Sequence, residues 1–200
     1  MVESICVFCG SGTGKSSSHA HAAAGLGALL AETGRTLVYG GSNVGLMEIL
    51  ADAGLEAGGR VVGVMVDALV EKEVAHSGLS EMHIVGTMSE RKAMMADLSD
   101  AFVALPGGIG TLDELFEIWT WSQLGLHRKP FGMLNVDGFF GPLLTYLSQV
   151  ADQRFMRPEH LEMLLVDEDP RRLLDRMDIY RFPDLPKWID GEAGRRVTHP

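Results

Sequence analysis

The amino-acid sequence predicts an α/β protein with a Rossmann-like, doubly wound parallel sheet and helices on both of its faces. Short β-rich runs alternate with longer segments of helical pattern along almost the whole chain, which is typical of a parallel sheet covered by helices. The runs CVF, LVY, VVGVMV and AFVAL are nearly continuous in apolar residues, as expected of strands buried on both faces. Glycine-rich loops follow three of these runs, at the sheet edge where such folds bind ligands.

The strands are expected at the short apolar runs, which are residues 4–8, 36–39, 60–66, 83–85, 101–105 and 131–135. The helices are expected at the longer segments between and after them, which are residues 17–32, 44–57, 89–98, 111–124, 141–153 and 170–177. Two of these helices are preceded or opened by the S/T-x-x-E pattern of a capping box, at Thr87 with Glu90 and at Thr111 with Glu114.

Length and composition predict one domain. The chain has 200 residues, 46% of them hydrophobic and 22% charged, and domains typically run to about 100–200 residues. We expect the domain to span residues 1–180 and residues 181–200, which are richer in Pro, Gly and charge, to form a peripheral tail. The formal net charge of −10 argues against nucleic acid or an anionic membrane as partner, because both bind clustered Lys and Arg.

Cysteine usage and the absence of targeting signals predict a reduced, cytoplasmic protein. The only cysteines, Cys6 and Cys9, form a CxxC inside a predicted strand, where side chains three apart point to opposite faces. No second CxxC completes a zinc site, and His19 and His21 are two apart on a predicted helix, where they cannot converge on one ion. We therefore expect no metal site and no cofactor.

The run PGGIGTLDE, residues 106–114, is the most informative part of the sequence, because it follows an apolar strand and opens an amphipathic helix. Its glycines let the backbone approach a ligand closely. The helix start offers unpaired N–H groups and a positive dipole end to an anion. The sequence therefore predicts a phosphate cradle, with Glu114 one turn further on.

Two other glycine loops are expected to line the same cleft, one from Gly10 to Gly14 and one that contains Gly40, Gly41 and Gly45. The first contains GTGKSS, but it lacks the leading glycine of a triphosphatase P-loop. No GxGxxG with a suitably placed acidic residue supports a nicotinamide dehydrogenase either.

Spacing alone leaves two interpretations of Glu114 open, a helix cap and a ligand-facing carboxylate. The basic pair Arg91 and Lys92 is similarly ambiguous between a solvated pair and a functional one. It lies at a helix start, where the dipole disfavours cations, so a phosphate or the Glu114 carboxylate is a candidate partner. The apolar surface of residues 111–124 is wide enough for either deep burial or a subunit interface, and the eleven Met residues are interpreted as core or interface filling.

Together, PGGIGTLDE, the upstream MSERKAMM and YGGSNVGLM, and VFCGS near the start closely resemble the LOG (lonely guy) family of cytokinin riboside 5′-monophosphate phosphoribohydrolases. The resemblance covers about residues 4–165 and implies a Rossmann-like homodimer. It also implies hydrolysis of a nucleoside 5′-monophosphate to free base and ribose 5-phosphate, with Arg91 and Glu114 as the catalytic pair.

The same resemblance implies substrate contacts from Glu73, Lys92 and Thr120 and from the loop Gly108, Ile109, Gly110, Thr111, Leu112, Asp113 and Glu114. Gly107 of the phosphate cradle and Gly10, Ser11, Gly40 and Gly41 of the other two glycine loops are the further predicted substrate-binding residues. The chain departs from the family pattern at Ser42, Glu48 and Ser89, which affects the base pocket and loop geometry more than the reaction.

The implied chemistry suits these residue types. Breaking a glycosidic bond develops positive charge on the ribose, which a carboxylate such as Glu114 stabilises, or the carboxylate aligns a water. Arg91 would orient that carboxylate, the ribose hydroxyls or the phosphate. The alternative is a non-catalytic nucleotide-binding or carrier protein with the same phosphate loop. A lysine decarboxylase is a third interpretation, but none of the lysines lies in a convincing setting for a Schiff base with pyridoxal phosphate.

Overall fold

A computed structural model describes residues 2–70 and 75–183 of the chain. Within this described part, seven parallel strands form one sheet in the order β4-β3-β2-β1-β5-β6-β7. The strands are β1 (Ser4–Phe8), β2 (Thr36–Tyr39), β3 (Val61–Val66), β4 (Glu81–Val85), β5 (Ala101–Ala104), β6 (Phe131–Leu134) and β7 (Leu164–Asp167). The chain builds outward from β1 in one direction and then returns to place β5 on its other side, so the strand order reverses between β1 and β5.

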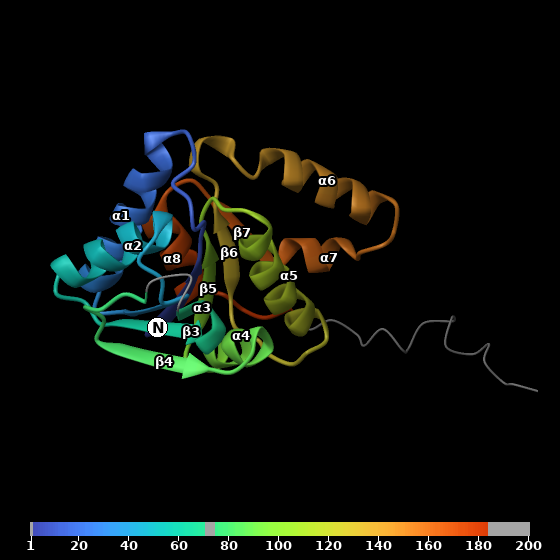
Figure 1. Ribbon diagram of the computed structural model, residues 1–200. Helices are drawn as coiled ribbons and strands as arrows, with labels where there is room; N and C mark the ends of the chain where they lie inside the picture. The colour runs from blue at the N-terminus through green and yellow to red at the C-terminus, as the bar shows by residue number, and fades with distance from the viewer. Residues whose placement is uncertain (1, 71–74, 184–200) are drawn as a thin grey trace, which may run out of the picture.

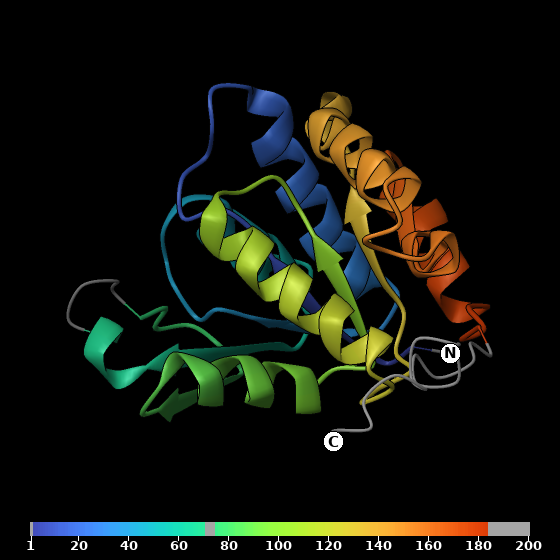
Figure 2. The ribbon, with the colours of Figure 1, turned by 90° about the vertical axis from the view of Figure 1, so that its right-hand side faces the viewer.

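The helices cover both faces of the sheet, as Figure 1 and the rotated view of Figure 2 show. They are α1 (Ser17–Glu32), α2 (Gly45–Glu56), α3 (Asp67–Val70), α4 (Met88–Asp97), α5 (Ile109–Gln123), α6 (Gly141–Asp152), α7 (Pro158–Glu162) and α8 (Pro170–Asp178), with a 3-10 turn η1 (Val136–Gly138). Buried side chains of α1, α2 and α8 pack on one face, and those of α4, α5 and α6 on the other. The predicted fold class is thereby confirmed.

Cys6 in β1 and Cys9, the residue after β1, lie on opposite faces of the sheet, in the two separate hydrophobic clusters, as predicted from the CxxC spacing. Both are buried free cysteines. Burial raises the pKa of each thiol above its ordinary value, so both stay protonated at neutral pH. Within residues 2–70 and 75–183, no group of three or more His, Cys, Asp or Glu side chains is placed to hold a metal ion.

All six predicted strands and six predicted helices are present, but the sequence interpretation missed β7, α3, α7 and η1. β7 was not predicted because its apolar run is short and an acidic segment follows it directly. As an edge strand paired only with β6, it needs less apolar sequence than a central strand. None of the described helices is long and apolar enough to cross a bilayer. Of the predicted tail, residues 184–200 lie outside the described residues.

The predicted start of the helix after PGGIGTLDE was wrong by two residues. α5 begins at Ile109, with Gly108 in an extended conformation at its N-cap. Thr111 is therefore the third residue of the helix and not its cap, and the proposed Thr111–Glu114 capping box does not exist. The corresponding box before α4 does form, because the Glu90 N–H donates to Thr87 Oγ1 at 3.1 Å and the Thr87 N–H donates to Glu90 Oε2 at 3.0 Å.

Candidate active site

The three glycine loops meet at the carboxyl edge of the sheet, beside the reversal of strand order between β1 and β5. The Gly10 N–H donates to the Pro106 carbonyl at 3.1 Å, and the Leu46 N–H donates to the Gly10 carbonyl at 3.1 Å. Gly45 has φ +63, and a side chain there would overlap the Ser11 backbone, so only glycine permits this crossing. The sequence correctly placed these loops in one cleft.

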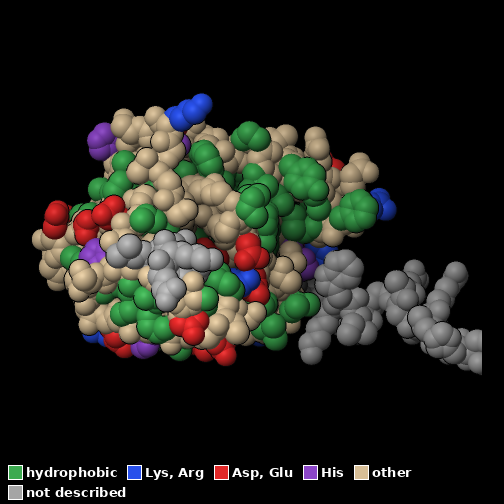
Figure 3. All heavy atoms as spheres, viewed as in Figure 1, with side chains coloured by type: hydrophobic (Ala, Val, Ile, Leu, Met, Phe, Trp, Pro, Cys, Tyr) green, Lys and Arg blue, Asp and Glu red, His purple; other side chains and the backbone are tan. Residues whose placement is uncertain are grey.

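A pocket of about 300 Å³ opens at this junction. It is lined by backbone and side chains of the glycine loops, β1, α2, α4 and the first turns of α5, namely Val7, Cys9, Gly10, Ser11, Gly40, Met47, Met88, Arg91, Gly108, Ile109, Gly110, Thr111, Asp113 and Glu114. On the face drawn in Figure 3, acidic side chains and a basic one lie together near the centre, with hydrophobic side chains around them.

Arg91 is held rigidly at the edge of this pocket by groups from two other elements. Its Nε donates to the Val64 carbonyl of β3 at 2.9 Å, and its Nη1 donates to Glu114 Oε1 at 2.8 Å. The residue is only 8% exposed. Its third nitrogen, Nη2, lies against Gly40 so closely that a side chain at position 40 would overlap it. Gly40 therefore provides the space in which the guanidinium lies.

Glu114 is the anionic partner of Arg91, one of the two candidate partners that the sequence suggested for the basic pair at the start of α4. Its side chain is 11% exposed, and the Arg91–Glu114 ion pair joins α4 to α5. Burial raises the pKa of the Glu114 carboxyl, and the Arg91 guanidinium partly offsets that rise. The ion pair uses Oε1, which leaves Oε2 for a ligand in the pocket. A buried carboxylate of this kind can stabilise positive charge or accept a proton.

The first turn of α5 provides the anion-binding part of the pocket. Its first intrahelical hydrogen bond runs from the Leu112 N–H to the Gly108 carbonyl at 3.2 Å, so the N–H groups of Ile109, Gly110 and Thr111 have no partner within the helix. Around Gly108 and Gly110, the space that a side chain would occupy is open. A phosphate can therefore approach these N–H groups and the positive end of the helix dipole.

Gly107 differs from these two glycines. A side chain there would overlap Thr111 and the Gly10 nitrogen, so Gly107 serves the packing of the loop against the buried Thr111. Gly41, with φ +78, lies beside Met82 and outside the pocket lining.

Lys92 does not line the pocket, in contrast to its neighbour Arg91. Its Nζ lies 3.0 Å from Asp113 Oδ2 and 2.8 Å from Glu117 Oε2, and its side chain is 15% exposed. These two carboxylates raise the pKa of Lys92 above its ordinary value. Glu117 had not been identified from the sequence, although its i+4 spacing from Asp113 and i+3 spacing from Glu114 could have indicated a shared helix surface.

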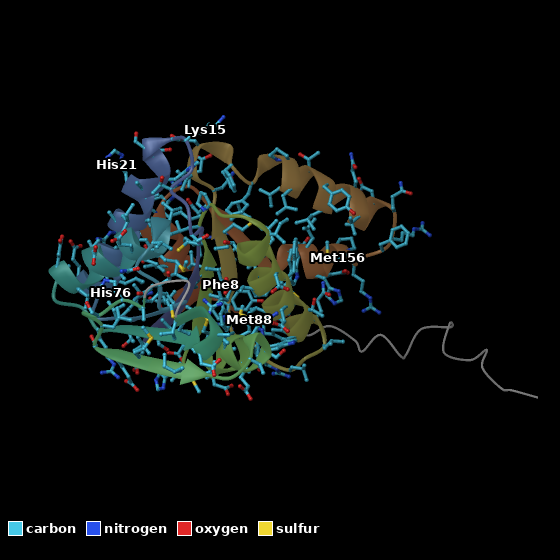
Figure 4. The ribbon with its side chains drawn as sticks, in the orientation of Figure 1. Phe8, Lys15, His21, His76, Met88 and Met156 are labelled. Atoms are coloured by element: carbon cyan, nitrogen blue, oxygen red, sulfur yellow. The ribbon has the colours of Figure 1, made fainter. Side chains whose placement is uncertain are left out.

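The remaining implied contacts lie away from the pocket or outside the described residues. Leu112 packs against the hydrophobic cluster under α5. Thr120 is exposed and donates through Oγ1 to the Phe116 carbonyl at 2.7 Å. Glu73 falls outside the described residues. Conversely, Met47 and Met88 line the pocket, and Figure 4 labels Met88 at the start of α4. Met47 is two residues after Gly45, and Met88 is three residues before Arg91. This closeness in sequence could have indicated the pocket, but the interpretation as core filling did not use it.

Fold and site together define a Rossmann-like protein of the nucleotide-binding class, with an Arg–Glu pair next to its anion-binding turn. The family model described as possible lysine decarboxylase matches residues 47–177. A cytokinin riboside 5′-monophosphate phosphoribohydrolase of Rhodococcoides fascians is 46% identical over 84% of this chain and 85% of its own length. The enzyme LOG7 of Arabidopsis thaliana, which has the same name, is 44% identical over 98% of this chain and 91% of its own. The chain belongs to the LOG family of cytokinin riboside 5′-monophosphate phosphoribohydrolases.

Solved structures share the fold. The molybdenum cofactor binding protein of Rippkaea orientalis superposes with a TM-score of 0.66 at 22% identity, over 89% of this chain and 96% of that one. The molybdenum cofactor carrier protein of Chlamydomonas reinhardtii gives 0.65 at 20% identity, over 88% and 99%. At these identities the likeness concerns the fold alone.

Proposed function

We propose that this protein hydrolyses the N-glycosidic bond of adenosine 5′-monophosphate or its N6-prenylated forms, releasing the free base and ribose 5-phosphate. The observation that carries the proposal is the buried Arg91–Glu114 pair in the same pocket as the unpaired N–H groups of α5. The names of the relatives from Rhodococcoides fascians and Arabidopsis thaliana support the same reaction class.

The 5′-phosphate binds the N–H groups of Ile109, Gly110 and Thr111, which the helix leaves unpaired. Glu114 follows one turn later on the same helix, so a ribose attached to that phosphate reaches its carboxylate. Because the phosphate is remote from the bond that breaks, its binding energy positions the sugar without taking part in the chemistry.

The C1′–N bond breaks with its electron pair leaving on the base, and positive charge develops on the ribose ring. Glu114 stabilises this charge through the oxygen that Arg91 leaves unengaged, or it aligns the attacking water and accepts a proton from it. The water oxygen bonds to C1′, and the base leaves with one proton. Water is the only co-reactant that this hydrolysis needs.

Arg91 keeps Glu114 in place and ionised. Two of its nitrogens are engaged by Val64 and Glu114, and the third faces Gly40 and can reach a ribose hydroxyl or a phosphate oxygen. The apolar side chains of Val7, Met47 and Met88 offer a surface for the flat base. Contacts from Glu73, Lys92 and Thr120 to the substrate remain predictions of the family resemblance.

We further propose a cytoplasmic homodimer built from one domain, residues 1–180, with a peripheral tail. Leu124 and Leu126, which follow α5, are 69% and 70% exposed, which supports a covered apolar surface in the assembled protein. Light scattering on the purified full chain distinguishes a dimer from a monomer.

The activity is tested by incubating the full chain with AMP and with isopentenyladenosine 5′-monophosphate, and by measuring ribose 5-phosphate and free base. We expect both products in equal amounts, and much slower release from adenosine, which lacks the phosphate anchor. Tight binding of the nucleotides without any product would instead support the non-catalytic carrier. A rate with adenosine equal to that with AMP would contradict the role of the α5 turn.

A further inference from the structure

A second cavity, of about 510 Å³, adjoins the first at the start of α1. The two share Gly10, Ser11 and Gly108 in their walls, so the glycine junction separates them. Beyond that junction the second cavity is lined by Lys15, His19, Leu46 and Phe139, among others. A mononucleotide in the first pocket leaves this space unused, although it is the larger of the two.

The lining of the second cavity suits a planar ring. Phe139 is 43% exposed and meets His19 edge to face, with ring centroids 5.5 Å apart and an interplanar angle of 78°. Leu46 contributes a further apolar surface. Lys15 provides positive charge at the rim, and Figure 4 labels it at the start of α1. An aromatic face with an accessible cation is how proteins bind nucleobases that carry phosphate.

The turn that carries Phe139 is held in position by hydrogen bonds of neighbouring residues. Asp137, in the η1 turn before Phe139, has φ 51, a conformation that is uncommon for a residue with a side chain. The Ser18 hydroxyl donates to Asp137 Oδ2 at 2.5 Å, and the Phe140 N–H donates to Asn135 Oδ1 at 2.8 Å. The turn that carries Phe139 is thus tied to α1 and to the end of β6, so the cavity exists before any ligand binds.

The position of the cavity relative to the phosphate cradle limits what can occupy it. A phosphate on the N–H groups of α5 lies next to Gly108, and Gly108 borders both cavities. The space beside Gly108 and Gly12 is open, which lets a second phosphate pass across the junction. A group in the second cavity is therefore attached on the far side of the phosphate from the ribose.

From this juxtaposition we infer that the second cavity binds the second nucleoside of a pyrophosphate-linked dinucleotide whose first nucleotide occupies the Arg91–Glu114 pocket. The inference rests on the proposed function only in placing the phosphate at α5. It adds a ligand class, the dinucleoside pyrophosphates, that bind in competition with the mononucleotide substrate.

Calorimetry on the full chain tests the inference with ADP and diadenosine 5′,5′-pyrophosphate, which share one adenosine and the pyrophosphate and differ in the second nucleoside that esterifies the terminal phosphate of ADP. Because stacking one base on an aromatic side chain contributes about 1–3 kcal/mol, which is about five- to more than a hundredfold in affinity, diadenosine pyrophosphate should bind at least about fivefold more tightly than ADP. Phe139→Ala should remove the difference and leave the affinity for ADP and the hydrolysis of AMP unchanged. Phe155→Ala, at an 81% exposed phenylalanine after α6, serves as the matched control and should change nothing.

Equal affinity for the two ligands would overturn the inference, as would a Phe139→Ala protein that loses affinity for both ligands equally. The two proposals fail separately. A protein that hydrolyses AMP without any preference for the dinucleotide refutes only the second cavity, and one that shows the preference without hydrolysis refutes only the proposed activity.

Discussion

Replacing Gly40 by alanine tests the arrangement of the Arg91–Glu114 pair without substituting either partner. Alanine adds one methyl group, and at this position that methyl would overlap Arg91 Nη2 and press on the sulfur of Met47 at 3.1 Å. The guanidinium is buried and held at Nε and Nη1, so it cannot move aside while keeping both hydrogen bonds.

The magnitude follows from those two bonds. A hydrogen bond to a charged group contributes about 1.5–3 kcal/mol, and each 1.36 kcal/mol corresponds to about tenfold in rate. Losing one of the two bonds should therefore lower kcat/KM for AMP by about ten- to hundredfold. Because one hydrogen bond of the buried Arg91 guanidinium is then lost, the free energy of unfolding should fall by about 1.5–3 kcal/mol.

The assay compares ribose 5-phosphate release and urea unfolding for wild type, Gly40→Ala and Gly25→Ala. Gly25 lies in α1 with open space around it, and alanine there should stabilise the helix by about 0.5–1 kcal/mol and leave catalysis alone. A Gly40→Ala protein with a rate within about threefold of the wild type and an unchanged free energy of unfolding would refute the reasoning. The Arg91 guanidinium would then accommodate a methyl group that the structure shows overlapping it.

Three further predictions concern other charged groups. Lys92→Gln should lower kcat with little change in KM, and Lys92→Arg should retain activity, because the lysine does not line the pocket and pairs with two carboxylates of α5. A raised KM with unchanged kcat in steady-state kinetics would indicate direct substrate contact instead. Asp178→Ala should destabilise the fold by about 3 kcal/mol in urea unfolding, because it leaves the 7% exposed Arg35 without its 2.8 Å partner. The control Arg171→Ala removes an exposed ion pair and should lower the free energy of unfolding by less than about 1 kcal/mol. Equal effects of the two substitutions would contradict this prediction. Burial lowers the pKa of His127 below 6.5, so below that pH the unfolded chain binds a proton that the folded chain does not. The free energy of unfolding should therefore fall as the pH drops below about 6.5, which urea unfolding curves at pH 7.5 and 5.5 test. A His127→Gln protein with the same pH dependence would disprove the assignment to His127.

Much of the fold was predictable because strands buried on both faces leave a strong mark in the sequence. β1 and β2 were predicted with their observed bounds, since their apolar runs end abruptly in glycine loops or polar residues. β7 was not predicted, because an edge strand of four residues carries too little apolar sequence to stand out from the acidic segment after it.

The site was predictable where backbone chemistry determines it and less so where packing does. Glycine spacing was enough to bring three loops to one edge of the sheet. The start of α5 was misplaced because S/T-x-x-E has the same spacing at a helix cap and within a helix, and only the extended backbone of Gly108 distinguishes the two. The partners of Lys92 depend on how α4 packs against α5, which no local pattern specifies.

The most direct test of the central claim is a comparison of wild type with Glu114→Gln, which keeps the shape of the side chain and removes its charge. With AMP as substrate, kcat should fall by about 10²–10³-fold or more, while the dissociation constant for AMP stays within about threefold, because the phosphate is held by α5. Since burial raises the pKa of Glu114, the wild-type rate should also fall on the acid side with an apparent pKa above 4.5. A Glu114→Gln protein that keeps full activity would contradict the account.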